Sequence, residues 1–227
     1  MPYLILIVFI LALVFGPQWW ASWTFRRYSD NRDDIPGSGA ELARHLLRKM
    51  NIAEVGVELT DKGDHYDPQA RVVRLSPANH DGRSLTAVAV AAHEVGHAIQ
   101  HQRSEKLLAM RTRLIRTAQL AQQVGAGLMF AIPVITAITR APQSGVLMFL
   151  VGLGSMGMAT LVHLVTLPVE WDASFGKALP LLTHGRYIGE RDERAVRQIL
   201  RAAAFTYVAA SLASLLNLAR WFRFFRR

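Results

Sequence analysis

Residues 84–102 read SLTAVAVAAHEVGHAIQHQ, and this stretch decides the fold. Ser84 is of a type that caps helix N-termini, and the run from Thr86 to Ala92 has no charged side chain. Together they predict a buried helix over about 84–102. Two histidines and a glutamate then occur together inside this apolar helix, although burying polar groups without partners is costly. We therefore expect a central helix that carries a functional polar site.

The polar residues of this helix form an H-E-x-x-H motif, with His93, Glu94 and His97 at its fixed positions. Residues i and i+4 lie one turn apart on one helix face, so the two imidazoles can bind a single zinc ion. Zinc lowers the pKa of a bound water to about 7, and Glu94 would act as the general base that takes its proton. The alternative is a buried helix whose polar groups are merely hydrogen-bonded. Gly96 is costly in a helix, which suggests that a strand or a substrate approaches closely there.

A catalytic zinc site needs a third protein ligand. His101 lies about 12 Å along the helix axis from His93, which is too far for one metal ion, so we expect a helix-end or supporting role for it. Glu170, in the segment LPVEWDAS at residues 167–174, is the preferred third ligand, because two histidines and one carboxylate are a common catalytic zinc set. Asp172 is the second candidate. A solvated carboxylate after Pro168 is the alternative interpretation of both.

Several segments together resemble a known family. They are HEVGHAIQ at 93–100, LPVEWDAS at 167–174, the run from Asp67-Pro68 to Ser76-Pro77, and TYVAA at 206–210. With them the chain resembles the YugP-like neutral zinc metallopeptidases of bacterial membranes. The resemblance implies His93 and His97 as metal ligands, Glu94 as base and Glu170 as third ligand.

The arrangement is also similar to the HtpX and CAAX-prenyl peptidases, which are gluzincins. In that group an E-x-x-A-D-like motif ends in an aspartate that orients a ligating histidine. Ser174 stands at the matching position here. We expect either Ser174 or Asp172 to take that supporting role.

Composition points to a membrane rather than to nucleic acid. The chain has 227 residues, a net charge of +9, 51% hydrophobic residues and no cysteine, which excludes thiol catalysis and Cys-ligated metals. The positive charge flanks apolar segments, where basic residues meet lipid headgroups. Segments at 3–23, 117–139 and 144–167 are long and apolar enough to predict transmembrane helices, and 202–219 predicts a transmembrane or membrane-buried helix.

The distribution of basic residues predicts the topology. Residues 26–116 and 168–201 would lie in the cytoplasm, in a multi-pass protein of the bacterial cytoplasmic membrane whose active site faces the cytoplasm. A basic tail at 220–227 follows the last apolar segment. If the segment at 202–219 spans the membrane, the basic tail lies on the outer side, against the rule that basic residues stay on the cytoplasmic side.

The polar region between the first two apolar segments predicts a small α+β unit of zincin type. A helix is expected at Ser38–Met50, and short strands at Val55–Leu59 and Arg71–Leu75. The second strand precedes the H-E-x-x-H helix, and its edge could hold an extended peptide by backbone hydrogen bonds. The expected fold class is a mainly α integral membrane protein with three to four transmembrane helices plus this unit.

Peptide hydrolysis also needs a group that stabilises the developing oxyanion. Five side chains are candidates, and the sequence does not choose among them: His163, His184, Tyr187, Arg191 and Tyr207.

The first functional hypothesis is a membrane-embedded endopeptidase with one catalytic Zn2+. It would hydrolyse membrane or misfolded proteins by Glu-assisted attack of zinc-bound water. The second is a non-catalytic membrane scaffold with a structural metal site, although such a site needs no base. The third is a metal transporter, which the scarcity of ionisable residues inside the apolar segments disfavours. Expected partners are membrane lipids and protein or peptide substrates, without nucleic acid; the oligomeric state stays open.

Overall fold

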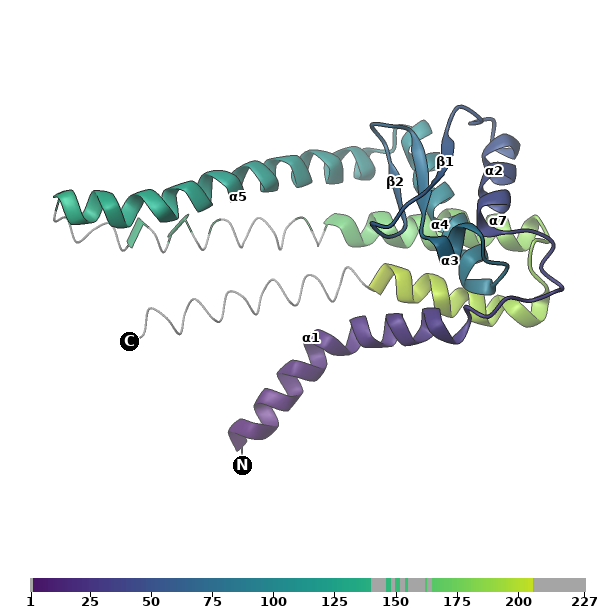
Figure 1. Cartoon of the computed structure of the whole chain (residues 1–227), viewed down its shortest axis with the longest axis horizontal. Coiled ribbons are helices and arrows are strands. Elements are labelled where there is room, and N and C mark those ends of the chain that lie inside the picture. Colours follow the sequence, from purple (N-terminus) through teal and green to yellow (C-terminus); the bar gives the residue numbers. More distant parts are fainter. Residues whose placement is uncertain are drawn as a thin grey trace.

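A computed structural model describes residues 2–139 and 165–205, together with six single positions between them (146, 147, 150, 151, 154 and 162). Helices make up most of this part of the chain, and a small sheet lies at one end of it (Figure 1). Two long helices, α1 (Pro2–Arg27) and α5 (Lys106–Thr139), extend away from the end that carries the sheet. The candidate site lies at the sheet end, so the fold there determines its geometry.

The sheet has three short strands in the order β1-β3-β2. β1 (Gly56–Leu59) pairs parallel with β3 (Val72–Leu75), and β2 (His65–Asp67) pairs antiparallel with β3 on its other side. The central position of β3 has a consequence for function. Both edges of β3 are occupied by neighbouring strands, so the expectation that a substrate peptide adds to this strand is wrong.

Local sequence signals place the two helices that pack beside the sheet. In α2 (Gly39–Lys49), Ser38 and Glu41 form a reciprocal capping box, and the buried face includes Leu46 and Leu47. In α4 (Leu85–Gln102), the Ser84 side chain accepts a hydrogen bond from the backbone N–H of Ala87. A single turn, α3 (Pro77–His80), connects β3 to α4. The H-E-x-x-H helix is therefore an internal element, buried from Leu85 to Gln100.

The second half of the site comes from the far end of the chain. Helical residues 165–171 continue into a wider π-helical turn, η1 (Asp172–Ala178), and then into α7 (Leu179–His184) and a helical stretch at 190–205. α4 packs directly against η1. The shared core includes Leu75, Val95 and Leu200, all fully buried. Packing of α4 on η1 therefore brings residues near 93 and near 170 together.

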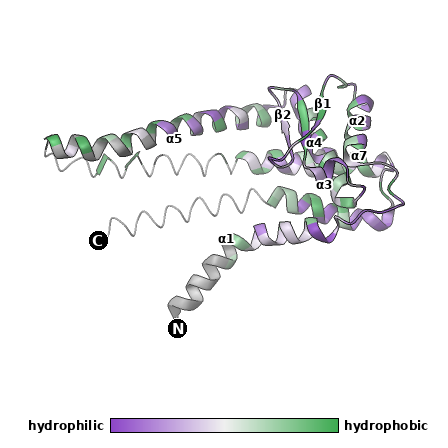
Figure 2. Ribbon diagram, in the orientation of Figure 1, coloured by the Kyte–Doolittle hydropathy of each residue, from purple (hydrophilic) through white to green (hydrophobic). Residues whose placement is uncertain are grey.

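In the part of the chain that the structure describes, no helix combines the length and the apolarity that crossing a membrane requires. This finding corrects the expected fold class: these residues form an α-rich domain with a small sheet, not three to four transmembrane helices. In α5 the physical reason is that the predicted span is not uniformly apolar: glutamines interrupt it and basic residues precede it. The predicted span 117–139 belongs to α5, which also carries basic residues, and Figure 2 shows hydrophilic residues interspersed along it.

The other predicted membrane segments are described only in part. Residues 3–23 lie within α1. The predicted segments at 144–167 and 202–219 fall largely outside the described residues, and the basic tail at 220–227 falls wholly outside them.

A candidate metal centre

His93 and His97 lie one turn apart on the same face of α4. Their ring centroids are 4.8 Å apart, and each side chain is almost completely buried. The helical spacing alone produces this pairing, as i and i+4 positions share a face.

Glu170 completes the cluster from the end of the helical segment before η1. Its Oε2 lies 3.1 Å from Nε2 of His93 and 3.2 Å from Nε2 of His97. The ligand atoms of the three residues all lie within 4.8 Å of one another, and the Glu170 side chain is fully buried. The two parts of the cluster are more than 70 residues apart in sequence. Two histidines and one carboxylate, closing on one point, are a donor set that holds catalytic zinc.

Two neighbouring side chains determine which nitrogen of each imidazole faces Glu170. Gln100 Nε2 donates to the backbone carbonyl of Val169, so its Oε1 is directed at Nδ1 of His97, 2.9 Å away. Ser174 Oγ donates to the backbone carbonyl of Leu200 and lies 3.0 Å from Nδ1 of His93. Each Nδ1 therefore carries the proton and donates it. The lone pair of each Nε2 is left to point at Glu170.

This arrangement requires a cation. Two imidazole lone pairs and a carboxylate oxygen are all acceptors, and they converge within hydrogen-bond distance. Buried acceptors converge in this way only around a positive charge, either a proton on each ring or a metal ion. The existing side chains thus fit a metal ion without rearrangement of their hydrogen bonds.

Arg111 of α5 also reaches the cluster. Its Nη2 lies 3.2 Å from Oε1 of Glu170, the carboxylate oxygen that faces away from the histidines. Burial raises the pKa of Glu170, but without a metal the two imidazoles, in their protonated form, outweigh this effect and hold its pKa well below the ordinary value. Glu170 is therefore charged at neutral pH. One of its carboxylate oxygens faces the metal position, and the other faces Arg111. No local motif marks Arg111, which in the sequence is one of several basic residues beside an apolar segment.

Glu94 lies next to the cluster and faces a cleft of about 390 Å³. Its side chain is nearly buried, with 6% exposed. Burial raises the pKa of Glu94 to about 7, and the charge of Glu170 contributes in the same direction. The apolar part of the cleft lining includes Phe25, Ala78 and Val90. A carboxylate with a pKa near neutrality can both accept and return a proton at physiological pH.

Comparison with known proteins identifies the family to which this geometry belongs. The family model described as "Putative neutral zinc metallopeptidase" matches residues 3–226, which is almost the whole chain. The chain belongs to this family. It is 36% identical to the "Putative membrane protease YugP" of Bacillus subtilis (strain 168), over 97% of this chain and 96% of that protein. No solved structure matches. The resemblance stated from the motifs is confirmed, and so is zinc as the metal, because His93, His97 and Glu170 can hold it.

The two supporting candidates near Glu170 both lie at this candidate metal centre. Ser174 contacts His93 in place of the aspartate expected from the related peptidases. Asp172 accepts a hydrogen bond from Nε2 of Gln100 and pairs with Lys177, 2.7 Å away. Burial raises the pKa of Asp172, but Lys177 and Gln100 outweigh burial and lower it. Asp172 therefore stays charged and helps to hold the amide that orients His97.

Among the described residues, the remaining sequence candidates lie outside the cluster. His101 Nδ1 shares a 2.8 Å hydrogen bond with the Tyr66 hydroxyl and lies outside the cluster. His184 is exposed at the end of α7, beside another pocket. Tyr187, another oxyanion candidate, contacts His45, 2.7 Å away. His163 and Tyr207 fall outside the described residues. Arg191 does not line the cleft beside Glu94.

Gly96 marks the contact between the two halves of this zinc peptidase site. A Cβ at this position would lie 2.7 Å from the backbone oxygen of Ala173 in η1. The close neighbour is therefore the π-helical turn, rather than the strand or substrate that the sequence suggested.

Proposed function

We propose that this chain is a zinc-dependent endopeptidase in which His93, His97 and Glu170 hold the metal and Glu94 is the general base. The observation that carries the proposal is the pair of oriented imidazoles: Gln100 and Ser174 direct both Nε2 lone pairs at Glu170, beside a carboxylate that faces a cleft. A structural metal site needs the ligands, but it has no use for an adjacent base of raised pKa.

The residues of the chain divide the chemistry among them. When bound, zinc supplies a Lewis acid that polarises the scissile carbonyl and makes water a stronger acid. Glu94 would accept the proton of the attacking water and return it to the leaving amine. Arg111 pairs with the carboxylate oxygen of Glu170 that faces away from the histidines. The apolar lining of the cleft favours a substrate segment with an apolar side chain.

The proposed substrates are membrane proteins or exposed segments of misfolded ones, and the proposed location is the bacterial cytoplasmic membrane, with the active site on the cytoplasmic side. Two facts support this location. The relative from Bacillus subtilis is named a membrane protease. Basic residues are concentrated beside the apolar stretches, including four between residues 106 and 116.

The test compares the wild-type chain with Glu94→Gln, both purified in mild detergent without chelator. Zinc is measured by elemental analysis, and cleavage is measured on unfolded casein with and without a chelator. We expect near-stoichiometric zinc in both proteins and chelator-sensitive cleavage in the wild type alone. Glu190→Gln, a change of the same kind at an exposed position, is the matched control and should keep full activity.

Two results would contradict the proposal. Folded wild-type protein that binds no zinc would show that the histidines only form hydrogen bonds. Zinc without cleavage in either protein would favour the scaffold with a structural metal site. Cell fractionation of the native protein tests the location separately.

A further inference from the structure

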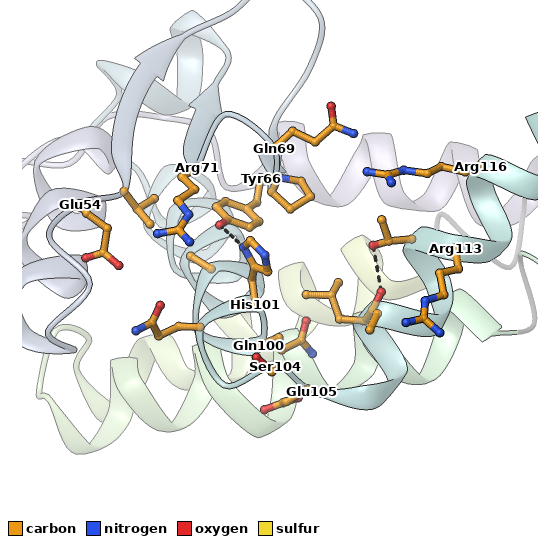
Figure 3. A pocket seen from close by; sticks show the side chains of 17 residues that line it. Glu54, Tyr66, Gln69, Arg71, Gln100, His101, Ser104, Glu105, Arg113 and Arg116 are labelled. Carbon is orange, nitrogen blue, oxygen red and sulfur yellow. Dashed lines mark hydrogen bonds between the residues drawn. The ribbon is translucent and has the colours of Figure 1, made fainter.

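A second, larger pocket of about 490 Å³ is lined by the C-terminal end of α4, whereas the Glu94 cleft is lined by residues 86–94 of the same helix. The larger pocket is bounded by the turn between β2 and β3, the end of α4 and the first turns of α5 (Figure 3). His93, Glu94 and Glu170 do not line it. The pocket therefore contains no metal ligand, and it shares Gln100 with the surroundings of the metal centre.

Three arginines gather around this pocket from two distant parts of the chain: Arg71, Arg113 and Arg116. Figure 3 shows Arg71 beside Tyr66 and Arg116 extending toward the turn that carries Gln69. Within the described residues, none of the three guanidinium groups makes an ion pair or a hydrogen bond. Arg113 and Arg116 lie one turn apart on α5, and Arg71 lies across Tyr66 and His101 from them (Figure 3), so the pocket carries an excess of positive charge that an anion would offset.

The backbone at Arg71 adds to this observation. Its φ is +54°, in the left-handed region that glycine or asparagine adopts at lower cost. The turn between β2 and β3 thus holds an arginine where a smaller residue would fit the backbone better.

The acidic residues of the pocket do not neutralise it. Glu105 is already paired with Lys177 at 3.1 Å, which leaves Glu54 against three arginines. Neutral donors are also present, including Gln69 and Ser104. Guanidinium groups with additional N–H and O–H donors suit an anion that has several acceptor oxygens, and a phosphate group is the best match.

The outer surface of α5 indicates where such a phosphate comes from. Met110, Arg113 and Leu120 are spaced three to seven residues apart and share a face of the helix. Met110 and Leu120 are 43% and 61% exposed, and no described residue covers them. A helix face that exposes apolar side chains around arginines is typical of the boundary between headgroups and acyl chains.

We propose that this pocket binds the phosphate headgroup of an anionic phospholipid, with Arg113 and Arg116 of α5 as its ligands and Arg71 adding positive charge from the other side of the pocket. The proposal extends the proposed membrane location, and it does not depend on the peptidase chemistry. Bound in this way, the lipid would hold α5 and the sheet end against the membrane surface.

The test titrates the full chain in mild detergent with short-chain phosphatidylglycerol and, separately, with phosphatidylcholine of the same chain length, and follows thermal unfolding. We expect a saturable rise in Tm with phosphatidylglycerol and little change with phosphatidylcholine. Replacing all three arginines with Gln should weaken the apparent affinity about 100-fold, because each cation near an anionic lipid contributes to binding. The matched control removes equal charge elsewhere on the surface, by Arg48→Gln, Arg186→Gln and Arg194→Gln, and should keep the wild-type affinity.

Further outcomes would overturn the proposal. Equal changes of Tm with both lipids would show that the pocket does not select an anionic headgroup. Equal losses of affinity in both triple variants would show that the pocket arginines do not bind the lipid. Inorganic phosphate that raises Tm at the same concentrations as the lipid would assign the pocket to a free anion. Saturation by an acidic peptide but not by phosphatidylglycerol would assign it to a protein segment. Casein cleavage by the pocket variant, measured in parallel, separates failure of this proposal from failure of the peptidase proposal.

Discussion

Replacing Gly96 with alanine should push the two halves of the metal centre apart. The new methyl group would lie 2.7 Å from the backbone oxygen of Ala173 and 3.3 Å from its Cα. These are backbone atoms of η1, so no side chain can rotate out of the way. To restore an ordinary contact of about 3.4 Å, η1 and α4 must separate by roughly 0.7 Å.

Two opposing free energies determine the effect of Gly96→Ala on stability. Removing a glycine from a helix interior gains about 1 kcal/mol, whereas overpacking a buried contact costs about 1–3 kcal/mol. We expect a net loss, seen as a decrease in Tm of a few degrees for a chain of this size. Metal binding should be more sensitive, because Glu170 and Ser174 flank Ala173, and metal–ligand distances tolerate only about 0.2 Å.

The assay is a competition for zinc between the protein and a chromophoric chelator, with thermal unfolding measured on the same samples. We expect Gly96→Ala to bind zinc about 10- to 100-fold more weakly, the range seen when the surroundings of metal ligands are altered. Gly127→Ala is the matched control: it lies in α5, no atom lies within 4 Å of the position that its new methyl group would take, and it should gain stability without loss of zinc affinity. If Gly96→Ala instead behaves like this control, the close packing of α4 on η1 does not set the geometry of the site.

Three further changes probe the surroundings of the site and the sheet. Ser174→Ala should weaken zinc binding about tenfold, because the imidazole that it orients loses its Nδ1 partner; Ser174→Asp should retain binding, and an unchanged affinity in the alanine variant would refute the orienting role. Arg111→Met should raise the pKa of Glu170, so that on acidification zinc affinity is lost at a higher pH than in the wild type. Arg111→Lys should restore much of the wild-type dependence of zinc affinity on pH. The same dependence in Arg111→Met and the wild type would contradict this. Asp67→Asn tests the turn before β3, where the backbone N–H of Ala70 lowers the pKa of Asp67. The wild-type carboxylate stabilises the fold above its unfolded pKa of about 4 and loses that contribution as the pH falls through its lower folded pKa. The difference in unfolding free energy between wild type and Asp67→Asn should therefore shrink as the pH decreases below about 4, as urea denaturation at several pH values would reveal.

Much of the local structure could be predicted from short-range patterns. Ser84 marks the start of α4, and the capping box at Ser38 marks the start of α2, because capping depends on residues within one turn. β2 was missed, since three residues with the turn-like composition His-Tyr-Asp show no alternation. β2 exists because β3 offers it an edge, and an edge is a property of the assembled sheet.

The apolar segments were the least reliable basis for predicting the fold class. Hydropathy over a window reports avoidance of water, and the described part of the chain has no helix fit to cross a membrane. The same limit explains why Arg111 escaped notice. In the sequence it is one of several basic residues near an apolar run, and only the packed structure brings its guanidinium to Glu170.

The sequence by itself determined the helix that carries His93, Glu94 and His97, because their spacing and the helical repeat are both local. The family resemblance, carried by motifs and ligand chemistry, pointed to Glu170. Only the tertiary structure decided how that carboxylate is held, with Gln100 and Ser174 orienting the imidazoles and Arg111 taking its second oxygen. It also brought Arg71 and Arg113 to one pocket. Contacts between residues 40 or more positions apart depend on how α4, α5 and η1 pack. No local pattern in the sequence predicts such packing.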